Sequence, residues 1–314
     1  MAVAQAARRV PKPKRHITKM ERSEWIAGWL FISPVVLGLL IWTLIPVVAS
    51  LTLSFMDYRI NLNEARWIGV DNYVRMFTRE PDFYQSLKVT FSFVIIQLPM
   101  GLAVALGGAM LLNTGVKGMS IFRAFFYLPA VLPAVATAYV WSWLLNLNYG
   151  VVNQFVKAFG GQPVNFFGNP KTAMPTLAVM TWFGVGQTMV IYLAGLLNIP
   201  PSLYEAAEID GAGRMRRFLH ITIPMLSPTI FYTVVMGLIL SFQYFTEAFI
   251  LTTGGPMKST YFYNLMLYQQ AFSMLRMGYA SALAWFLLFM ILIMTLVVFR
   301  SSAAWVYYET EMRR

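Results

Sequence analysis

Six uncharged and strongly apolar runs dominate this sequence and limit what the chain can fold into. They cover residues 25–56, 89–116, 124–156, 172–204, 221–246 and 277–299. A membrane-spanning helix needs about 20 consecutive apolar residues, so each run is long enough to cross a bilayer. Hydrophobic residues make up 58% of the chain and charged residues only 12%, which is too apolar for an ordinary soluble domain. The runs therefore predict an all-α polytopic membrane protein with six transmembrane helices.

Composition removes several classes of function. The chain has no cysteine, which excludes disulfide bonds, cysteine-based zinc sites and a thiol nucleophile. Its two histidines, His16 and His220, fall in different predicted segments and form no catalytic cluster. The net charge of +11 would suit nucleic acid, but a basic excess beside membrane spans is more typical of cytoplasmic loops. We therefore expect no metal site, no catalytic residues and no nucleic-acid partner.

The apolar runs divide the chain into three parts. Residues 1–24 carry seven Lys and Arg residues and two prolines, which predicts a basic cytoplasmic arm. A secretory signal is excluded because the run at 25–56 is longer than the apolar core of a signal peptide, and no small-residue cleavage site follows it. Residues 25–300 are predicted to form the transmembrane domain, and residues 301–314 a cytoplasmic tail.

The distribution of basic residues predicts the orientation. With the N-terminus inside, the inner segments hold 15 of the 24 Lys and Arg residues and the outer segments hold 9, which is the bias expected of cytoplasmic loops. Both termini are then cytoplasmic. The polar segment 57–88 becomes an outer loop, and the segment 200–228 faces the cytoplasm.

Two shorter segments are predicted to be helices that do not cross the membrane. Apolar residues recur at helical spacing in 151–159, which indicates a short amphipathic helix on the outer surface. It either packs on the bundle or meets a ligand, and packing is favoured because such a stripe needs no ligand. Residues 259–275 are uncharged but short and contain Asn264, Gln269 and Gln270, which favours an interfacial or pore-rim helix.

The cytoplasmic segment 200–228 contains signals for two helices. Pro200 and Pro201 block continuation of the fourth span, and Ser202 with Glu205 matches a capping box that would start a new helix. Gly211 is expected to end that helix in the left-handed conformation, and a second short helix is expected over 214–219. The small residues around Gly211 leave a low surface rimmed by acids and bases. A protein could dock there, although a solvated loop with capping residues remains the alternative.

The same segment resembles a known signature. EAAEIDGAGRMRRFLHITIP is similar to the EAA motif of permease subunits in binding-protein-dependent ABC importers, with Ile223 where leucine is more usual. FRAFFYLPAVLPAVATAYVW, LAGLLNIP and LTTGGPMKST resemble the carbohydrate-uptake branch, which includes the permeases for maltose-type oligosaccharides and for glycerol-3-phosphate. The likeness covers roughly residues 25–300. The residues on the expected motif positions are Glu205, Ala206, Ala207, Asp210, Gly211, Phe218, Ile221 and Pro224, and the first five of these are the implied ATPase-coupling residues.

The resemblance implies a type I ABC importer permease fold and a transport role. The chain would form half of the path for a sugar, whether an oligosaccharide, a disaccharide or a glycerol phosphate, delivered by an extracytoplasmic binding protein. The EAA segment would dock on a separate ATPase that binds ATP and Mg. The other implied partners are a homologous second permease and a second ATPase subunit, in the cytoplasmic membrane of a bacterium or archaeon. The absence of a P-loop sequence from the inner segments agrees with hydrolysis on another polypeptide.

A substrate path can be sought among polar residues within the spans. An acid in hydrocarbon is costly and therefore a functional candidate, and Glu247 stands at the outer end of the fifth run. Amide, carboxylate and aromatic groups suit a sugar because they bind hydroxyls and cover the ring. The alternative for Glu247 is a contact with a neighbouring subunit or with interfacial water. The predicted path comprises Glu247, Gln243, Tyr244, Trp182 and Gln187.

Two other classes of function were compared with an ABC permease. An ion-coupled secondary carrier would need intramembrane ion ligands or inverted repeats, and the sequence shows a single acid and no evident repeat. A membrane-embedded enzyme would need a catalytic cluster, which the spans lack. The sequence therefore favours a transport subunit that is not itself an enzyme.

Overall fold

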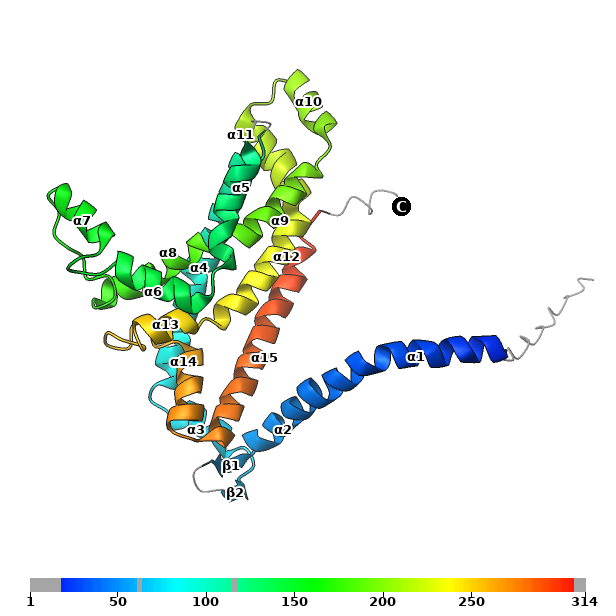
Figure 1. Ribbon diagram of the computed structural model, residues 1–314, viewed down its shortest axis with the longest axis vertical. Coiled ribbons are helices and arrows are strands. Elements are labelled where there is room, and N and C mark those ends of the chain that lie inside the picture. Colours follow the sequence, from blue (N-terminus) through cyan, green and yellow to red (C-terminus); the bar gives the residue numbers. More distant parts are fainter. Residues whose placement is uncertain (1–17, 61–63, 115–117, 308–314) are drawn as a thin grey trace, which may run out of the picture. The chain divides into compact units, whose positions relative to one another are not determined.

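The computed structural model describes residues 18–60, 64–114 and 118–307, and the described chain is mostly helical (Figure 1). It falls into two compact units, residues 1–52 and residues 53–314. Of the predicted cytoplasmic arm and tail, residues 1–17 and 308–314 lie outside the described residues.

The first unit is built from one long helical stretch. Helix α1 (Lys19–Leu39), the π-helical turn η1 (Leu40–Leu44) and helix α2 (Ile45–Ser54) together form a candidate membrane span. The Thr18 hydroxyl accepts a 3.2 Å hydrogen bond from the Glu21 amide, and the Glu21 side chain accepts a 2.9 Å bond from the Thr18 amide. This capping box starts the helix inside residues 1–24, the segment predicted to be a basic arm before the first span.

A proline explains the π-helical turn in this span. The amide of Ile45 bonds to the carbonyl of Leu40, five residues earlier, instead of to the usual fourth residue. Pro46 follows at once, has no N–H group, and its ring would collide with the carbonyl four residues back. Widening the helix by one residue ahead of the proline relieves that collision. Pro46 therefore changes the helix locally without ending it.

The outer segment after this stretch is partly ordered into strands, where the sequence predicted a loop. Strands β1 (Met56–Arg59) and β2 (Glu64–Trp67) pair antiparallel, and helix α3 (Asp71–Thr78) follows. The buried Asn72 amide donates hydrogen bonds of 2.9 Å to the Ser54 carbonyl and 3.0 Å to the Met56 carbonyl. These bonds pair backbone groups that the short hairpin leaves open.

A glycine lets this hairpin pack on the last span. A Cβ atom built on Gly278 would lie 2.0 Å from the Met56 carbonyl oxygen, so no larger residue fits there without displacing β1. The Ile60 amide also donates a 3.2 Å hydrogen bond to the Leu275 carbonyl. The hairpin of β1 and β2 is therefore fixed to the residues that precede and begin helix α15 (Met277–Ser302).

The second unit contains long helices and two bent helix pairs. Four helical stretches of the described chain, that of the first unit included, are long and apolar enough to cross a membrane, and six are if each bent pair counts as one span. This agrees with the six predicted spans. The elements are α4 (Phe83–Leu112), α5 (Met119–Tyr127) with η2 (Leu128–Val131) and α6 (Ala134–Leu144), bent by 101°, α7 (Val151–Ala158), α8 (Pro170–Phe183) and α9 (Gly186–Leu197), bent by 49°, α10 (Pro201–Ile209), α11 (Arg214–Arg217), η3 (Phe218–Thr222), α12 (Ile223–Phe242), α13 (Thr246–Leu251), α14 (Tyr263–Tyr268), η4 (Gln269–Ser273) and α15.

Two hydrophobic clusters hold these helices together. The first cluster joins the first half of α4 to α14 and α15 through Phe83, Phe93 and Tyr263, all essentially inaccessible to solvent. The second cluster joins the second half of α4 to α9 and α12, with Ala105 and Ala109 packed near Met189 and Tyr192. Small residues let helices approach closely in membranes. The clusters fix α12 against α4 at both ends of the bundle.

The two predicted non-spanning helices are present. Helix α7 confirms the helix expected at 151–159; Val152 packs on the first cluster, while the Phe155 side chain is 63% exposed. In 259–275 the helical part is α14 with η4, and Tyr263, Leu265 and Met266 of α14 are buried in the first cluster. The Tyr263 amide donates to the Thr90 hydroxyl at 2.9 Å, and the Tyr263 hydroxyl donates to the Leu283 carbonyl at 2.9 Å. One face of α14 is therefore part of the hydrophobic core, and the position of 259–275 along an interface or pore rim stays a prediction.

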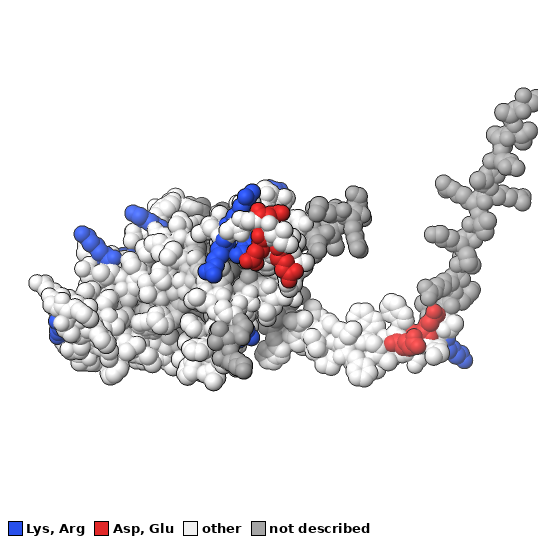
Figure 2. All heavy atoms as spheres, turned by 90° about the horizontal axis from the view of Figure 1, so that it is seen from above, with Lys and Arg blue, Asp and Glu red and all other residues white. Residues whose placement is uncertain are grey.

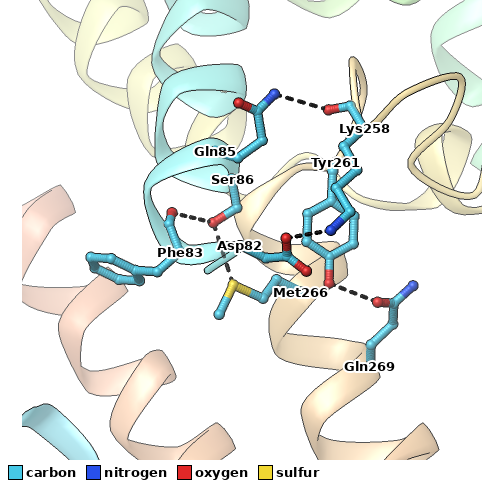
Figure 3. Close-up of polar contacts among 8 residues, drawn as sticks. All are labelled: Asp82, Phe83, Gln85, Ser86, Lys258, Tyr261, Met266 and Gln269. Carbon is cyan, nitrogen blue, oxygen red and sulfur yellow. Dashed lines mark hydrogen bonds and ion pairs between the residues drawn. The ribbon is translucent and has the colours of Figure 1, made fainter. Parts of the chain in front are cut away.

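Polar contacts tie the loop before α14 to the start of α4 (Figure 3). Lys258 forms an ion pair with Asp82, and the Lys258 carbonyl accepts a 3.3 Å hydrogen bond from the Gln85 amide. The Ser86 hydroxyl lies 3.4 Å from the Met266 sulfur, and the Tyr261 hydroxyl donates to the Gln269 amide oxygen at 2.7 Å. The start of α4 is thereby tied to the segment that contains α14.

Candidate functional site

The predicted docking segment forms two short helices at the upper end of the bundle in Figure 1. Helix α10 begins at Pro201 with Pro200 as its N-cap, and no side chain caps it. The predicted capping box of Ser202 and Glu205 is therefore wrong. Proline is favoured at the first helical position because its missing N–H is not needed there and its φ is already helical. Because the helix already begins at Pro201, Ser202 lies inside its first turn and cannot act as the N-cap.

The predicted end of this helix is confirmed. Gly211 has a φ of 74°, the left-handed conformation that glycine adopts without strain. The Ala212 amide bonds to the Ala207 carbonyl at 2.8 Å, and the Gly211 amide to the Glu208 carbonyl at 3.0 Å. This is the pattern of a glycine-terminated helix. No atom lies within 4 Å of a Cβ atom built on Gly211, so conformation rather than space requires glycine there.

Two side-chain contacts fix α10 to the helix that follows. Glu208 and Arg217 form an ion pair of 3.2 Å across the Gly211 turn, and the Tyr204 and Thr222 hydroxyls are hydrogen-bonded at 3.0 Å. The second helix does not stop near residue 219 as expected. It continues through the π-helical turn η3 into α12, because Pro224 follows that turn as Pro46 follows η1.

The face around Gly211 is exposed and carries both charges, as Figure 2 shows where red and blue side chains gather at this end. Of the predicted coupling residues, Glu205, Ala206, Asp210 and Gly211 are exposed and Ala207 is half-buried. Two large apolar side chains also point outward: Ile209 is 87% exposed and Met215 is 69% exposed. Apolar residues inside a charged rim are typical of a surface that another protein covers.

A cavity of about 750 Å³ lies between the two hydrophobic clusters. Its walls come from α4, η2, α6, α8, α9, α12 and α13. The Ser241 hydroxyl donates a 2.6 Å hydrogen bond to the Gln97 amide oxygen, and the Tyr244 ring stacks on Phe93 with centroids 4.5 Å apart. Phe93 lies ten residues after the first residue of α4, which is about 15 Å along that helix. Because Tyr244 follows α12 and stacks on Phe93, the end of α12 meets α4 at this point. The cavity therefore lies partway along α4, and it is open on one side, since lining residues such as Leu240 and Phe183 are more than half exposed.

The helix is interrupted after α12, and this interruption determines which of the predicted residues line the cavity. Residues 243–245 are not helical, and Glu247 lies in the first turn of α13. Tyr244 and Glu247 line the cavity, whereas Gln243 is exposed and does not. The path prediction treated the fifth run as one unbroken helix, and the interruption after Phe242 separates Gln243 from the residues that line the cavity.

Gln187 of α9 lines the cavity but Trp182 of α8 does not. The Trp182 ring lies against α4, where a Cβ atom built on Gly101 would be 3.6 Å from it, and its indole N–H has no hydrogen-bond partner within the described structure. The structure thus brings together three of the five predicted path residues, Gln187, Tyr244 and Glu247. Their role in substrate binding stays a prediction.

The sequence reading missed several polar and aromatic residues of the same cavity. Gln97 could have been predicted from the sequence, because its side chain is an amide in the middle of an apolar run. Thr137 and Trp141 depend on the 101° bend between α5 and α6, which sets the direction of α6, whereas Thr181 lies in α8 and Ser241 in α12. These additional lining residues are Gln97, Thr137, Trp141, Thr181 and Ser241.

The cavity offers hydrogen bonds and aromatic surface but no metal site. Amides and hydroxyls donate to and accept from polar ligands, and the Trp141 ring, packed edge-on against Phe183 at 4.7 Å, presents apolar surface. Nowhere in the described residues do three His, Asp or Glu side chains come close enough to hold a metal ion. The arrangement suits reversible binding of a polar, uncharged or weakly charged molecule.

The fold and these two sites define a membrane transport subunit. The model of the family "Binding-protein-dependent transport system inner membrane component" matches residues 97–306. The chain belongs to this family. The assignment includes the EAA segment and most of the cavity, and it decides against the ion-coupled carrier considered from sequence.

Known relatives agree over nearly the full length. The probable ABC transporter permease protein YesP of Bacillus subtilis is 43% identical over 92% of this chain and 94% of its own. The lactose transport system permease protein LacF of Rhizobium radiobacter is 33% identical, with 91% and 97% covered. A solved bacterial ABC transporter that imports the acidic polysaccharide alginate has a TM-score of 0.78 at 24% identity, covering 91% of this chain and 98% of that one, and supports the fold.

Proposed function

We propose that this chain forms half of the translocation path of an ATP-driven sugar importer. The observation that carries the proposal is the helix that starts at the exposed EAA segment and ends beside the cavity. That helix runs from Arg214 without interruption to Phe242. A force applied at the segment therefore reaches the cavity wall directly. The sugar class is supported by the lactose permease among the relatives.

Three kinds of partner complete this proposal. A homologous second permease supplies the other half of the path, and two ATPase subunits bind ATP and Mg and dock on the EAA segment. The exposed Ile209 and Met215 supply apolar contact area for that docking. A binding protein delivers the sugar outside, as supported by the alginate transporter that was also solved in complex with a periplasmic binding protein. The complex belongs in a bacterial or archaeal cytoplasmic membrane, with both termini of this chain inside.

Within the cavity, we assign substrate contact to three residues. Gln187 and Glu247 present hydrogen-bonding groups from α9 and α13, and the Tyr244 hydroxyl is buried without a hydrogen-bond partner in the described structure. A buried hydroxyl without a partner is costly, and a sugar hydroxyl would satisfy it. Alternating access, driven by the ATPases, would open this cavity first to one side and then to the other.

The experiment that tests the coupling role compares two substitutions of Gly211 in the reconstituted complex. Gly211→Val is strained at a φ of 74° and should distort the turn, whereas Gly211→Asn is tolerated in that conformation. We expect Gly211→Val to insert in the membrane normally but to lose sugar-stimulated ATP hydrolysis and uptake. Gly211→Asn should retain most of both activities. Full coupling in the valine variant would contradict the proposal.

The relatives leave the charge of the sugar open. Lactose is a neutral disaccharide and alginate is an acidic polysaccharide. The chemistry of the residues that line the cavity is therefore the basis for choosing between a neutral and an anionic sugar.

A further inference from the structure

We propose that the cavity selects uncharged saccharides and that Glu247 is the residue that disfavours anionic ones. This inference rests on the proposed function, because it assigns the substrate class of the same cavity. It goes beyond the family, whose members carry substrates of both kinds.

The charge balance of the cavity is the first observation. Glu247 is the single ionisable side chain of ordinary acidity or basicity among the lining residues, and none of those residues is Lys, Arg or His. A site that binds carboxylate, sulfate or phosphate groups normally supplies Arg or Lys to pair with them. This wall supplies a carboxylate instead. An anionic ligand would meet repulsion with no compensating cation from this chain.

The freedom of the carboxylate is the second observation. In the described structure no basic side chain forms an ion pair with Glu247. Its charge is therefore not neutralised within the chain and acts on whatever enters the cavity. Tyr244 stands beside it and lines the same wall. The buried hydroxyl of Tyr244 is suited to a hydrogen bond with a neutral hydroxyl group of a ligand.

The remaining lining residues suit a neutral polyol. Gln97 and Gln187 each donate and accept hydrogen bonds, and several threonine and serine hydroxyls surround them. Trp141 offers a face for the apolar side of a sugar ring. Two like charges a few ångströms apart at a partly buried site repel strongly enough to change affinity by about tenfold or more. Neutral sugars escape that cost and keep every other contact.

The test measures binding to the whole complex in lipid nanodiscs without the binding protein, so that selectivity belongs to the membrane subunits. The probes are two matched pairs: lactose with its monosulfate ester, and the methyl ester of trigalacturonate with trigalacturonate itself. Saturation-transfer NMR titrations give the affinity of each probe. We expect the neutral member of each pair to bind about tenfold more tightly than the anionic member.

Two variants assign the effect. Glu247→Gln keeps the shape of the side chain and removes its charge, and it should bring the affinity ratio of each pair close to one. Asp71→Asn removes an exposed outer acid that is paired with Arg79 at 3.6 Å and should leave the ratio unchanged. Each variant is first shown to purify with the same partner subunits.

Three outcomes would contradict the inference. Equal binding of neutral and anionic probes by the unmodified complex would overturn the charge selectivity and leave the sugar path standing. An unchanged ratio in Glu247→Gln, or loss of assembly in that variant, would show that Glu247 serves a subunit contact instead. Absence of binding of all four probes would overturn both this inference and the proposed role of the cavity.

Discussion

The Tyr307 amide donates a 2.8 Å hydrogen bond to the hydroxyl of Ser227, which lies 80 residues earlier in the chain. Ser227 is buried near the start of α12, and its hydroxyl also donates to the Pro224 carbonyl at 2.6 Å. Trp305 packs near Phe231 on the same helix, with ring centroids 6.1 Å apart. The end of the last span is thereby attached to the helix that carries the EAA segment.

Removing this attachment should free the end of the chain locally. In Ser227→Ala the Tyr307 amide loses its acceptor, which costs about 1 kcal/mol. Amide exchange at residues 303–307 should then accelerate by roughly fivefold, as measured by hydrogen–deuterium exchange mass spectrometry. Ser302→Ala is the control, because the Ser302 hydroxyl bonds only to the Phe299 carbonyl of its own helix. Equal acceleration in both variants would show that the Ser227 contact does not hold the segment.

The close packing of β1 on α15 predicts an intolerant glycine. Gly278→Ala places a methyl group 2.0 Å from the Met56 carbonyl oxygen, so the hairpin must shift, at a cost of about 1–3 kcal/mol. We expect a Tm lowered by several degrees in detergent. Gly107→Ala in α4 meets no atom within 4 Å and should keep or raise the Tm. An unchanged Tm for Gly278→Ala would mean that the hairpin is held elsewhere.

Tyr261 predicts a loss of stability at alkaline pH. Burial, followed by the nearby charges of Asp82 and Glu80, raises the pKa of Tyr261 from 10.0 to about 12. The folded state therefore favours the neutral phenol. That stabilisation is complete below pH 10 and is lost as the pH rises from 10 to 12.

The matching variant is Tyr261→Phe, which cannot ionise. Its melting temperature should fall less steeply than that of the unmodified protein between pH 10 and 12, although at neutral pH it lacks the 2.7 Å bond to Gln269. Thermal unfolding followed across this pH range provides the comparison. Parallel pH curves for the two proteins would contradict the assignment.

The EAA segment shows what local sequence signals can and cannot predict. Gly211 was predicted correctly because a left-handed residue at a helix end is a requirement of a single position. The Ser202 cap was not, because Pro201 competes for the start of the same helix, and the stronger local preference prevailed. The number of spans was also predictable, since it depends only on the length of each apolar run.

The cavity was only partly predictable, because it depends on breaks within spans. Gln187 and Glu247 were found from residue type alone. Gln243 was misplaced since α12 ends at Phe242, and nothing in the uncharged run 221–246 marks that break. Trp141 was missed because its position follows from the bend between α5 and α6, which is a property of packing and not of periodicity.

The π-helical turn η3 has a mechanical consequence. Because it keeps α11 and α12 in one continuous helix, the stretch from Arg217 to Ser241 acts as a stiff lever about 36 Å long. A rotation of about 10° about the end that carries the EAA segment would displace the cavity end by about 6 Å, slightly more than the rise of one helical turn. Because Pro224 widens the helix without ending it, motion at one end of the helix is transmitted to the other end. A helix break at the same place would have prevented this.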